Sequence, residues 1–444
     1  MTSPVSPALV GISGLLVASL AGCLQTQFSS GTSAISSTGA GPTSSAAASS
    51  TGSSTGQPPG TSTGTAVASS AGASSAGSST GSSTGTSSGT TGGSTTGLSF
   101  TATTYPVNGS PHWITTYQND GGVVNLATAD YNDGTIFTLP GNGNGTFQNP
   151  NPVFVASNAS FQSICSGDFN GDGLADLAFS TWGSFDHGYG VLTGQSDGGF
   201  SVTLPNASFV SSLQILCAKL GGDALLDLLA PVGDALYILP GEVEAQFGQD
   251  EPLTSLGDYR AVAVGNFGAN AMPQIAVAEN GASMAAVLER EGDGGYALFD
   301  SWSTGQGPVG VTVADFNGDG CEDLATADNG GDSTTVVLSG CGNLGSSSST
   351  YQCPGCGRPQ WLVAADFDGN GSPDIAMAFY DPLPTGETVA IYLNLGDGTF
   401  AAPLFFNGGV GPSCIATGDF NGDGRPDLAI SDIGGQSVTV LLHQ

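Results

Sequence analysis

Four nine-residue acidic segments carry the clearest chemical signal in this sequence. Each has Asp at positions 1 and 9 and Gly at position 6. Positions 3 and 5 are Asn and Asp in three of the segments and Asp and Asn in the fourth. Alternate side chains at positions 1, 3 and 5 can converge on one point, because Gly at position 6 permits a tight bend. At least three carboxylates gathered in this way repel one another strongly unless a divalent cation neutralises them.

Calcium is the cation that this set of donors favours. Oxygen ligands alone disfavour zinc and copper, and abundant carboxylates favour Ca²⁺ over Mg²⁺. We therefore predict about four structural calcium ions, each also bound by the main-chain carbonyl at position 7; hydrogen-bonded turns without metal are the alternative. The predicted side-chain ligands are Asp168, Asn170, Asp172, Asp176, Asp315, Asn317, Asp319, Asp323, Asp366, Asp368, Asn370, Asp374, Asp419, Asn421, Asp423 and Asp427.

An EF-hand, which begins with a similar pattern, does not fit these segments. An EF-hand needs a bidentate Glu at position 12 and a helix on each side. Position 12 is instead Phe179, Thr326, Met377 or Ile430, within a short apolar run. Each segment is therefore expected to be a loop between two strands.

The four segments belong to a repeat of about fifty residues. Degenerate copies at 117–125, 219–227 and 266–274 fill the gaps, so that position 9 falls at 125, 176, 227, 274, 323, 374 and 427. Apolar runs of four to eight residues, bounded by Gly, Asn, Asp and Pro, indicate strands rather than helices. Four short strands in each of seven repeats favour a β-propeller, with a solenoid as the rival.

The two ends of the repeat region predict that the ring is closed. The last repeat stops at Gln444 after its third strand, and residues 98–107 read like the missing outer strand. Phe100 would be its aromatic marker, equivalent to Phe147, Phe200, Phe247, Tyr296, Tyr351 and Phe400. An N-terminal strand that completes the last blade leaves no open edge. We expect an all-β, seven-bladed propeller over residues 98–444.

The repeats resemble the FG-GAP, or VCBS-type, repeats of integrin α-subunit propellers and of many secreted bacterial proteins. The resemblance is strong in the four acidic copies and weak in the three degenerate ones. It implies a seven-bladed propeller whose acidic loops bind Ca²⁺. It also implies ligand binding on the face opposite those loops.

The N-terminal region predicts export and anchoring. Residues 8–22 form an apolar run that is too short for a comfortable membrane span and is typical of a secretory signal. The run ends in Leu20-Ala-Gly-Cys23, which resembles the lipobox of bacterial lipoproteins. Residues 1–23 are therefore predicted to be a lipoprotein signal peptide with Cys23 as the lipidation site, although no Lys or Arg precedes the run. An ordinary cleaved signal is the alternative.

Residues 24–97 consist almost entirely of Ser, Thr, Gly and Ala and predict a disordered linker. Together with the lipobox, this linker would tether the propeller to the bacterial envelope, at the outer membrane or the cell surface. The membrane contact would be made through the lipid anchor alone.

Composition and cysteine content exclude several kinds of site. A net charge of −32 with only five Lys and Arg argues against nucleic acid as a partner. Three His in the whole chain argue against a multi-histidine metal site. Seven cysteines follow Cys23, and export favours disulfides; Cys341–Cys353 is our first choice of pair. Redox chemistry or zinc binding at Cys353-Pro-Gly-Cys356 is the alternative.

Two loops between second and third strands combine aromatic and acidic residues. Their candidate ligand-binding residues are Trp182, Asp186, His187, Tyr189, Tyr380 and Asp381. Such side chains suit a sugar or a peptide, and ordinary packing is the alternative. Trp113 and Trp361, at equivalent positions of two first strands, are expected in the core.

The sequence as a whole predicts a non-enzymatic, calcium-stabilised binding or adhesion module that contacts a protein or a glycan. A polysaccharide lyase and a structural component of the envelope are the alternatives. The scarcity of His, Lys and Arg disfavours the enzyme.

Overall fold

A computed structural model describes most of the chain beyond residue 96. The described ranges are 84–88, 97–118, 121–156, 159–183, 188–203, 214–220, 225–242, 245–248, 251–254, 257–268, 272–292, 295–341 and 346–444. The predicted signal peptide, Cys23 and most of the predicted linker lie outside these ranges. Within them the regular structure is β-sheet, and no helix has the length and apolarity to cross a membrane.

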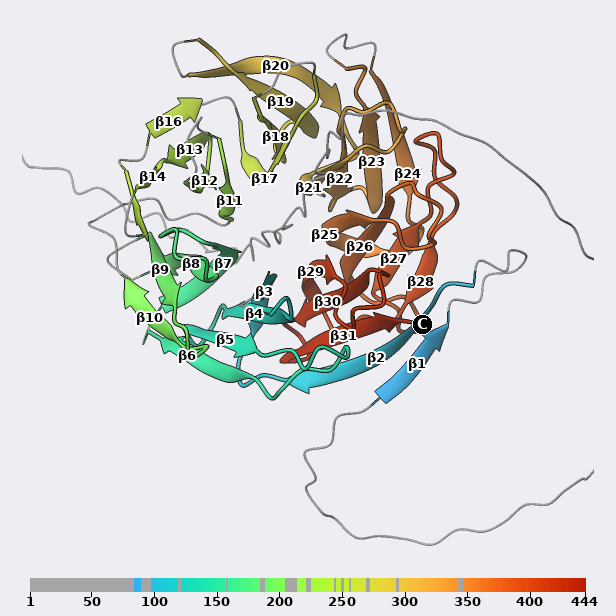
Figure 1. Cartoon of the computed structure of the whole chain (residues 1–444). Coiled ribbons are helices and arrows are strands. Elements are labelled where there is room, and N and C mark those ends of the chain that lie inside the picture. Colours follow the sequence, from blue (N-terminus) through green and yellow to red (C-terminus); the bar gives the residue numbers. More distant parts are fainter. Residues whose placement is uncertain are drawn as a thin grey trace, which may run out of the picture. The chain divides into compact units, whose positions relative to one another are not determined.

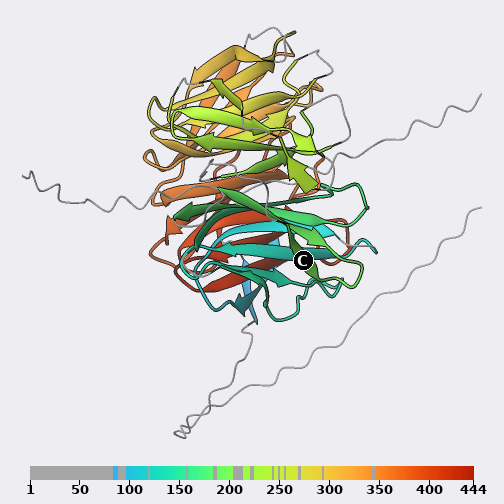
Figure 2. The ribbon, with the colours of Figure 1, turned by 90° about the vertical axis from the view of Figure 1, so that its left-hand side faces the viewer.

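Seven antiparallel blades surround a central axis, as the repeat predicts (Figure 1). Figure 2 shows the ring from the side, where the strands run between its two faces. Blade 1 contains β3 (Pro111–Gln118), β4 (Val124–Asp130), β5 (Thr135–Leu139) and β6 (Asn151–Val155). Blade 2 contains β7 (Ala159–Gly167), β8 (Asp176–Gly183), β9 (Tyr189–Gly194) and β10 (Phe200–Thr203). Blade 3 contains β11 (Leu216–Ala218), β12 (Asp227–Val232), β13 (Ala235–Leu239) and β16 (Glu251–Thr254), with a small ribbon of β14 (Gly241–Glu242) and β15 (Gln246–Phe247).

The second half of the ring continues the same order. Blade 4 contains β17 (Tyr259–Gly265), β18 (Gln274–Glu279), β19 (Met284–Arg290) and β20 (Tyr296–Ser303). Blade 5 contains β21 (Pro308–Ala314), β22 (Asp323–Asp328), β23 (Ser333–Leu338) and β24 (Ser347–Gln352). Blade 6 contains β25 (Gly357–Ala365), β26 (Asp374–Asp381), β27 (Val389–Tyr392) and β28 (Leu404–Phe406). Blade 7 contains β29 (Pro412–Gly418), β30 (Asp427–Asp432) and β31 (Ser437–His443), and its outer strand is β2 (Ser99–Pro106).

The predicted closure of the ring is confirmed. β2 pairs antiparallel with β31 in a register that runs from Phe100 opposite His443 to Pro106 opposite Ser437. Phe100 is fully buried, and its ring lies 5.1 Å from that of Phe406 in blade 6. Residues from the two ends of the propeller therefore complete one sheet. The structure adds β1 (Thr84–Ser88), which lies within the predicted linker and pairs with the outer edge of β2.

The second strand of every blade follows one packing rule. The residue after position 9 is Leu or Ile in all seven blades, and it is buried each time. The next residue is Ala in six of the seven, as in Ala178 and Ala325, and both of these are fully buried. A small side chain at this place lets neighbouring blades approach closely. The recurrent Leu-Ala pair is therefore a consequence of sheet-on-sheet packing.

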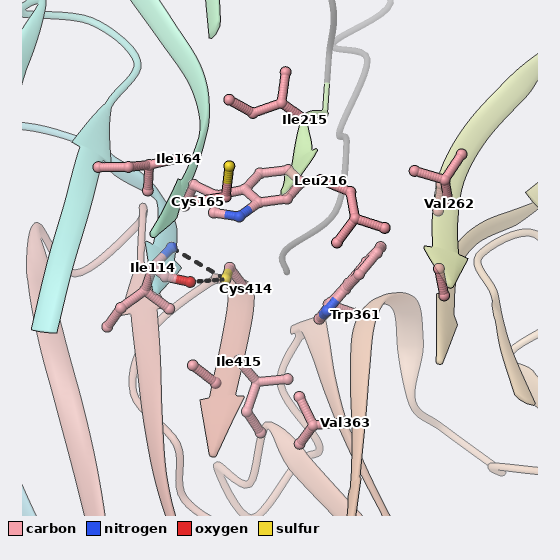
Figure 3. Packing of buried hydrophobic residues seen from close by; sticks show 14 of the residues in the cluster. Ile114, Ile164, Cys165, Ile215, Leu216, Val262, Trp361, Val363, Cys414 and Ile415 are labelled. Carbon is pink, nitrogen blue, oxygen red and sulfur yellow. Dashed lines mark hydrogen bonds between the residues drawn. The ribbon is translucent and has the colours of Figure 1, made fainter. Parts of the chain in front are cut away.

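The inner strands place β-branched side chains around the centre (Figure 3). Ile114, Ile164, Val262, Val363 and Ile415 come from five different blades. The predicted core role of the two tryptophans is confirmed, since both are buried and the ring centroids of Trp113 and Trp361 lie 5.9 Å apart.

The predicted Cys341–Cys353 disulfide is wrong. The structure pairs Cys321 with Cys341 and Cys353 with Cys356, and a third disulfide, Cys165–Cys217, joins the inner strands of blades 2 and 3. Cys341 and Cys353 flank the outer strand β24, whose six residues span about 20 Å. The two cysteines therefore lie near opposite ends of this strand and cannot form a disulfide with each other. The prediction that these cysteines form structural bridges is confirmed.

The closing strand generates the first testable prediction. Phe100→Ala should lower the free energy of unfolding by about 3–5 kcal/mol, because a fully buried aromatic side chain is lost where the two ends of the propeller meet. Phe299→Ala, in the outer strand β20, is the control, since Phe299 is only partly buried. Urea unfolding would measure both. Equal losses in the two variants would show that β2 does not hold the ring closed.

Candidate metal centres

The four acidic segments form loops on one face of the propeller. They connect the first and second strands of blades 2, 5, 6 and 7, as predicted. Gly at position 6 has a positive φ in all four, for example 85° at Gly173 and 83° at Gly424. A side chain would be strained there, so the bend requires glycine. The loops of blades 5, 6 and 7 occupy three successive blades.

The carboxylate at position 1 organises each loop by accepting backbone amides. In blade 7, Asp419 Oδ1 accepts the amides of Gly422 and Asp423 at 2.7 and 3.1 Å, and Asp419 Oδ2 accepts that of Gly424 at 2.9 Å. The side-chain Nδ2 of Asn421 donates to Asp423 Oδ2 at 3.1 Å. Positions 1, 3 and 5 thus converge, as the spacing predicts. Blades 2 and 5 repeat these contacts.

The blade 6 loop brings carboxylates together most directly. Asp366, Asp368 and Asp374 each offer an oxygen, and the three oxygens lie within 4.8 Å of one another. This is the loop in which position 3 is Asp rather than Asn. Oxygen donors at this spacing fit a hard divalent cation. The donors of all four loops are therefore consistent with Ca²⁺.

Position 9 has a second role that the sequence did not reveal. In blade 7, Asp427 Oδ2 accepts the amide of Phe420 at 2.8 Å, and Asp427 Oδ1 accepts the amide of His443 at 2.7 Å. The same two contacts occur in blades 2, 5 and 6. The carboxylate therefore links position 2 of the loop to the end of the third strand. Each oxygen keeps a further lone pair with which it could also bind a cation.

Burial of these carboxyl groups raises their pKa. The four side chains are fully buried, and desolvation raises the pKa of Asp176 to about 6 and that of Asp323, Asp374 and Asp427 to about 7. The accepted amides oppose this rise, and the nearby loop carboxylates add to it. A cation bound in the loop would favour the charged form.

Each degenerate loop keeps all or half of this link although it has lost the cage. Asp227 accepts the amides of Leu220 and Gly241, each at 2.9 Å. Gln274 Oε1 accepts the amide of Phe267 at 3.0 Å, and Asn125 Oδ1 accepts that of Gly141 at 2.9 Å. A polar acceptor therefore occupies position 9 in all seven blades. The persistence of a polar residue at position 9, where positions 1, 3 and 5 have changed, was the signal in the sequence for this second role.

Two charged side chains cross between blades at the degenerate loops. Glu322, at position 8 of the blade 5 loop, accepts the amide of Asn266 in blade 4 at 2.5 Å. Arg290 Nη1 of blade 4 donates to the carbonyl of Leu220 in blade 3 at 3.0 Å. Lys219, at position 1 of the blade 3 loop, is exposed. The cation that reaches this loop is Arg290.

The aromatic residue at position 2 joins each complete loop to the next blade. Phe169 packs on Phe247 at 5.6 Å between ring centroids, and Phe316 packs on Phe400 at 5.5 Å. The equivalent contact from blade 7 to blade 1 is Phe420 on Phe147, and that from blade 6 to blade 7 is Phe367 on Phe100. The two aromatic markers of the repeat are thus partners across blade interfaces.

The candidate ligand-binding residues on the opposite face have different outcomes. Asp186 and His187 lie outside the described residues, as does the side chain of Trp182. Tyr189 is buried, with its ring 5.6 Å from that of Phe247, which favours ordinary packing. Only the Tyr380 and Asp381 pair lies at the surface.

Arg358 joins that surface pair and was not singled out from the sequence. Its Nε and Nη2 donate to the two carboxylate oxygens of Asp381 at 2.7 and 2.6 Å, and its guanidinium lies 4.3 Å from the centroid of the Tyr380 ring. The guanidinium holds the pKa of Asp381 below its usual range. Both charged side chains remain about half exposed, at 44% and 50%. These three residues form what we call the Arg358 cluster.

A further set of acids lies at the ends of second strands. Asp130, Asp328 and Asp432 are buried and end β4, β22 and β30. Each approaches a glycine that precedes the first strand of its blade, and a Cβ on Gly109, Gly305 or Gly409 would lie 2.0–2.5 Å from a carboxylate oxygen. Asp328 Oδ2 accepts hydroxyls of Ser333 and Thr335 and the amide of Gly305. The recurring spacing of five residues after position 9 was the signal that we missed.

Comparison with known proteins identifies the repeat and the fold. A family model for the FG-GAP-like repeat matches residues 119–179, 315–377 and 366–430. No curated protein matches the chain.

Similar solved structures include a streptogramin B lyase (16% identity, 78% of this chain and 98% of that one, TM-score 0.51). A virginiamycin B lyase from Staphylococcus aureus is 12% identical over 77% of this chain and 99% of its own, with a TM-score of 0.51. A lectin from Agrocybe aegerita that recognises non-reducing terminal N-acetylglucosamine is 16% identical over 74% of this chain and 85% of its own, with a TM-score of 0.47. At these identities the likeness concerns the fold alone.

The double role of position 9 predicts different effects of two substitutions in one loop. Asp427→Ala should lower the free energy of unfolding by about 2–4 kcal/mol with or without calcium, because it leaves two amides without their acceptor. Asp419→Ala should cost stability chiefly when calcium is present, since its amides lie in an exposed turn. Thermal unfolding in calcium and in a chelator would compare them. Equal losses in the chelator would contradict the assigned role of position 9.

The buried strand-end acids predict a pH dependence of stability. Desolvation raises the pKa of Asp328 to about 6. Between about pH 4 and pH 6 the folded state therefore keeps a proton that the unfolded state has already released. This contribution to stability is complete below pH 4 and is lost as the pH rises through 6. Asp328→Asn cannot ionise, so its stability relative to the unsubstituted protein should improve by about 2–3 kcal/mol from pH 4 to pH 7.

The control for this measurement is Asp381→Asn. The pKa of Asp381 is lowered by Arg358, so its variant should change with pH in the opposite direction. Parallel pH profiles for the two variants, measured by urea unfolding, would contradict the assignment.

Proposed function

We propose that this seven-bladed propeller, which contains FG-GAP-like repeats, is a calcium-stabilised, non-enzymatic binding or adhesion module of the bacterial envelope. The FG-GAP-like propeller fold suggests a binding module. The observation that carries the proposal is the division of labour between the two faces. One face holds the acidic loops, and the other presents the exposed Arg358 cluster.

Calcium would be held by positions 1, 3, 5 and 9 of the four complete loops and would neutralise their carboxylates. At about 1 mM calcium and a Kd of about 10⁻⁴ M, each site would add roughly 1.4 kcal/mol to the stability. The aromatic contacts of position 2 would carry that stabilisation into the neighbouring blade. The blade 7 site would be the weakest, because Arg425 Nη2 already donates to Asp423 Oδ2 at 2.9 Å.

The Arg358 cluster is the best-supported place for a ligand. A guanidinium and a carboxylate, both about half exposed, lie beside an aromatic ring. Such a group can exchange part of its internal hydrogen bonding for the hydroxyls of a glycan or the polar groups of a protein. Export to the envelope is supported by the three disulfides within the described part of the chain. The lipobox at Cys23 would supply the membrane anchor.

Glycan and protein arrays, followed by an assay of any bound polysaccharide for cleavage, test this proposal. We expect binding without cleavage, and a loss of affinity of at least tenfold in Arg358→Ala. Arg260→Ala is the matched control, because Arg260 also pairs with an aspartate, Asp258, at 3.1 Å, but has no aromatic partner in that pair. Cleavage of the bound polysaccharide would favour the lyase alternative. Equal losses in the two variants would place the ligand elsewhere.

A further inference from the structure

The blade 5 loop differs from the other three complete loops at position 7. This position is Leu174, Ser372 or Arg425 in blades 2, 6 and 7, and these side chains are half-buried or exposed. In blade 5 it is Cys321, which is buried and bonded to Cys341, with 5.4 Å between the Cα atoms. Of the three disulfides in the described residues, only this one includes a residue of an acidic loop.

The segment after β23 contacts this loop at positions 5, 7, 8 and 9. Cys341 Sγ lies 3.4 Å from Asp319 Oδ1 at position 5, and its bond to Cys321 fixes position 7. Ser339 Oγ donates to the carbonyl of Glu322 at position 8, and the amide of Ser339 donates to Asp323 at position 9. The side of the cage formed by positions 5 to 9 is therefore tied to the end of the third strand.

We propose that the Cys321–Cys341 disulfide holds the blade 5 loop ready for calcium, so that the affinity of this one site depends on the redox state of the pair. The inference rests on the proposed calcium binding. Without an ion, the carboxylates of Asp315 and Asp319 repel each other and favour an open loop. The disulfide opposes that opening and keeps the carbonyl of Cys321 beside them. Holding a site in its bound geometry raises affinity by lowering the ordering cost of binding.

A dithiol reductant can reach this pair more readily than Cys353–Cys356. Cys341 is half-buried and its sulfur lies at the exposed side of the loop, whereas Cys353 and Cys356 are both fully buried. Reduction breaks the Cys321–Cys341 bond and leaves two thiols, while the reductant loses two electrons and two protons and becomes a disulfide. Because linkage is reciprocal, calcium must stabilise the disulfide against reduction by the factor with which the disulfide strengthens calcium binding.

Calcium titration of the full chain by calorimetry and native mass spectrometry tests the first half of this proposal. The double variant Cys321→Ser/Cys341→Ser should bind calcium about tenfold more weakly at one site and unchanged at the other three. The double variant Cys353→Ser/Cys356→Ser is the matched control and should keep all four sites. Unchanged affinity at every site in the first variant would overturn the proposal.

The reciprocal measurement uses the unsubstituted protein and does not depend on a variant that folds. Dithiothreitol would be titrated with and without calcium, and the freed thiols would be labelled and mapped by mass spectrometry. The equilibrium for reducing Cys321–Cys341 should shift about tenfold toward the disulfide in calcium, and that for Cys353–Cys356 should not change. Reduction that calcium does not affect would overturn the inference and leave the proposed calcium sites intact. Failure of the unsubstituted protein to bind calcium would overturn the calcium part of the proposed function as well.

Discussion

The structure depends most on one buried hydrogen-bonding side chain in each blade, at position 9 of the repeat. Among the described residues, it accepts an amide from the turn after the first strand in every blade except blade 1, and an amide near the end of the third strand in every blade except blade 4. An amide left without a partner in the interior costs about 1–3 kcal/mol. Because Asp227 makes both contacts in a blade without an acidic cage, and Asn125 and Gln274 make one each, the link does not require metal. Metal binding can therefore be gained or lost on a frame that persists.

The loops are nevertheless part of the ring rather than appendages to it. Position 9 fixes the amide of position 2, and the ring of position 2 packs on the aromatic marker of the next blade. At blade 7 this neighbour is Phe147 of blade 1, so the contact also bridges the point where the chain ends meet. Charge neutralisation in a loop and cohesion between blades are thus two effects of the same few residues.

Much of this fold and of its acidic loops could be predicted from the sequence, because a repeat records local geometry. The spacing of position 9 indicated seven blades, and the register of Phe100 among the aromatic markers indicated which strand closes the ring. Gly at position 6 and the acids before it indicated convergent side chains, since a tight bend leaves them few directions. Each of these features is read from short segments that recur along the chain.

Only the tertiary structure decided which residues make the contacts that cross a blade or a blade interface. Glu322 serves the loop of Asn266, and Arg290 serves that of Leu220, each in the preceding blade. Cys341 pairs with Cys321 rather than Cys353 because the strand β24 lies between Cys341 and Cys353 and keeps them apart. The sequence by itself determined the repeat, the ring and the loops that can hold a cation. It could not determine these partners, because a side chain's neighbours across a sheet interface depend on how two blades dock, and a local pattern of residues does not contain that geometry.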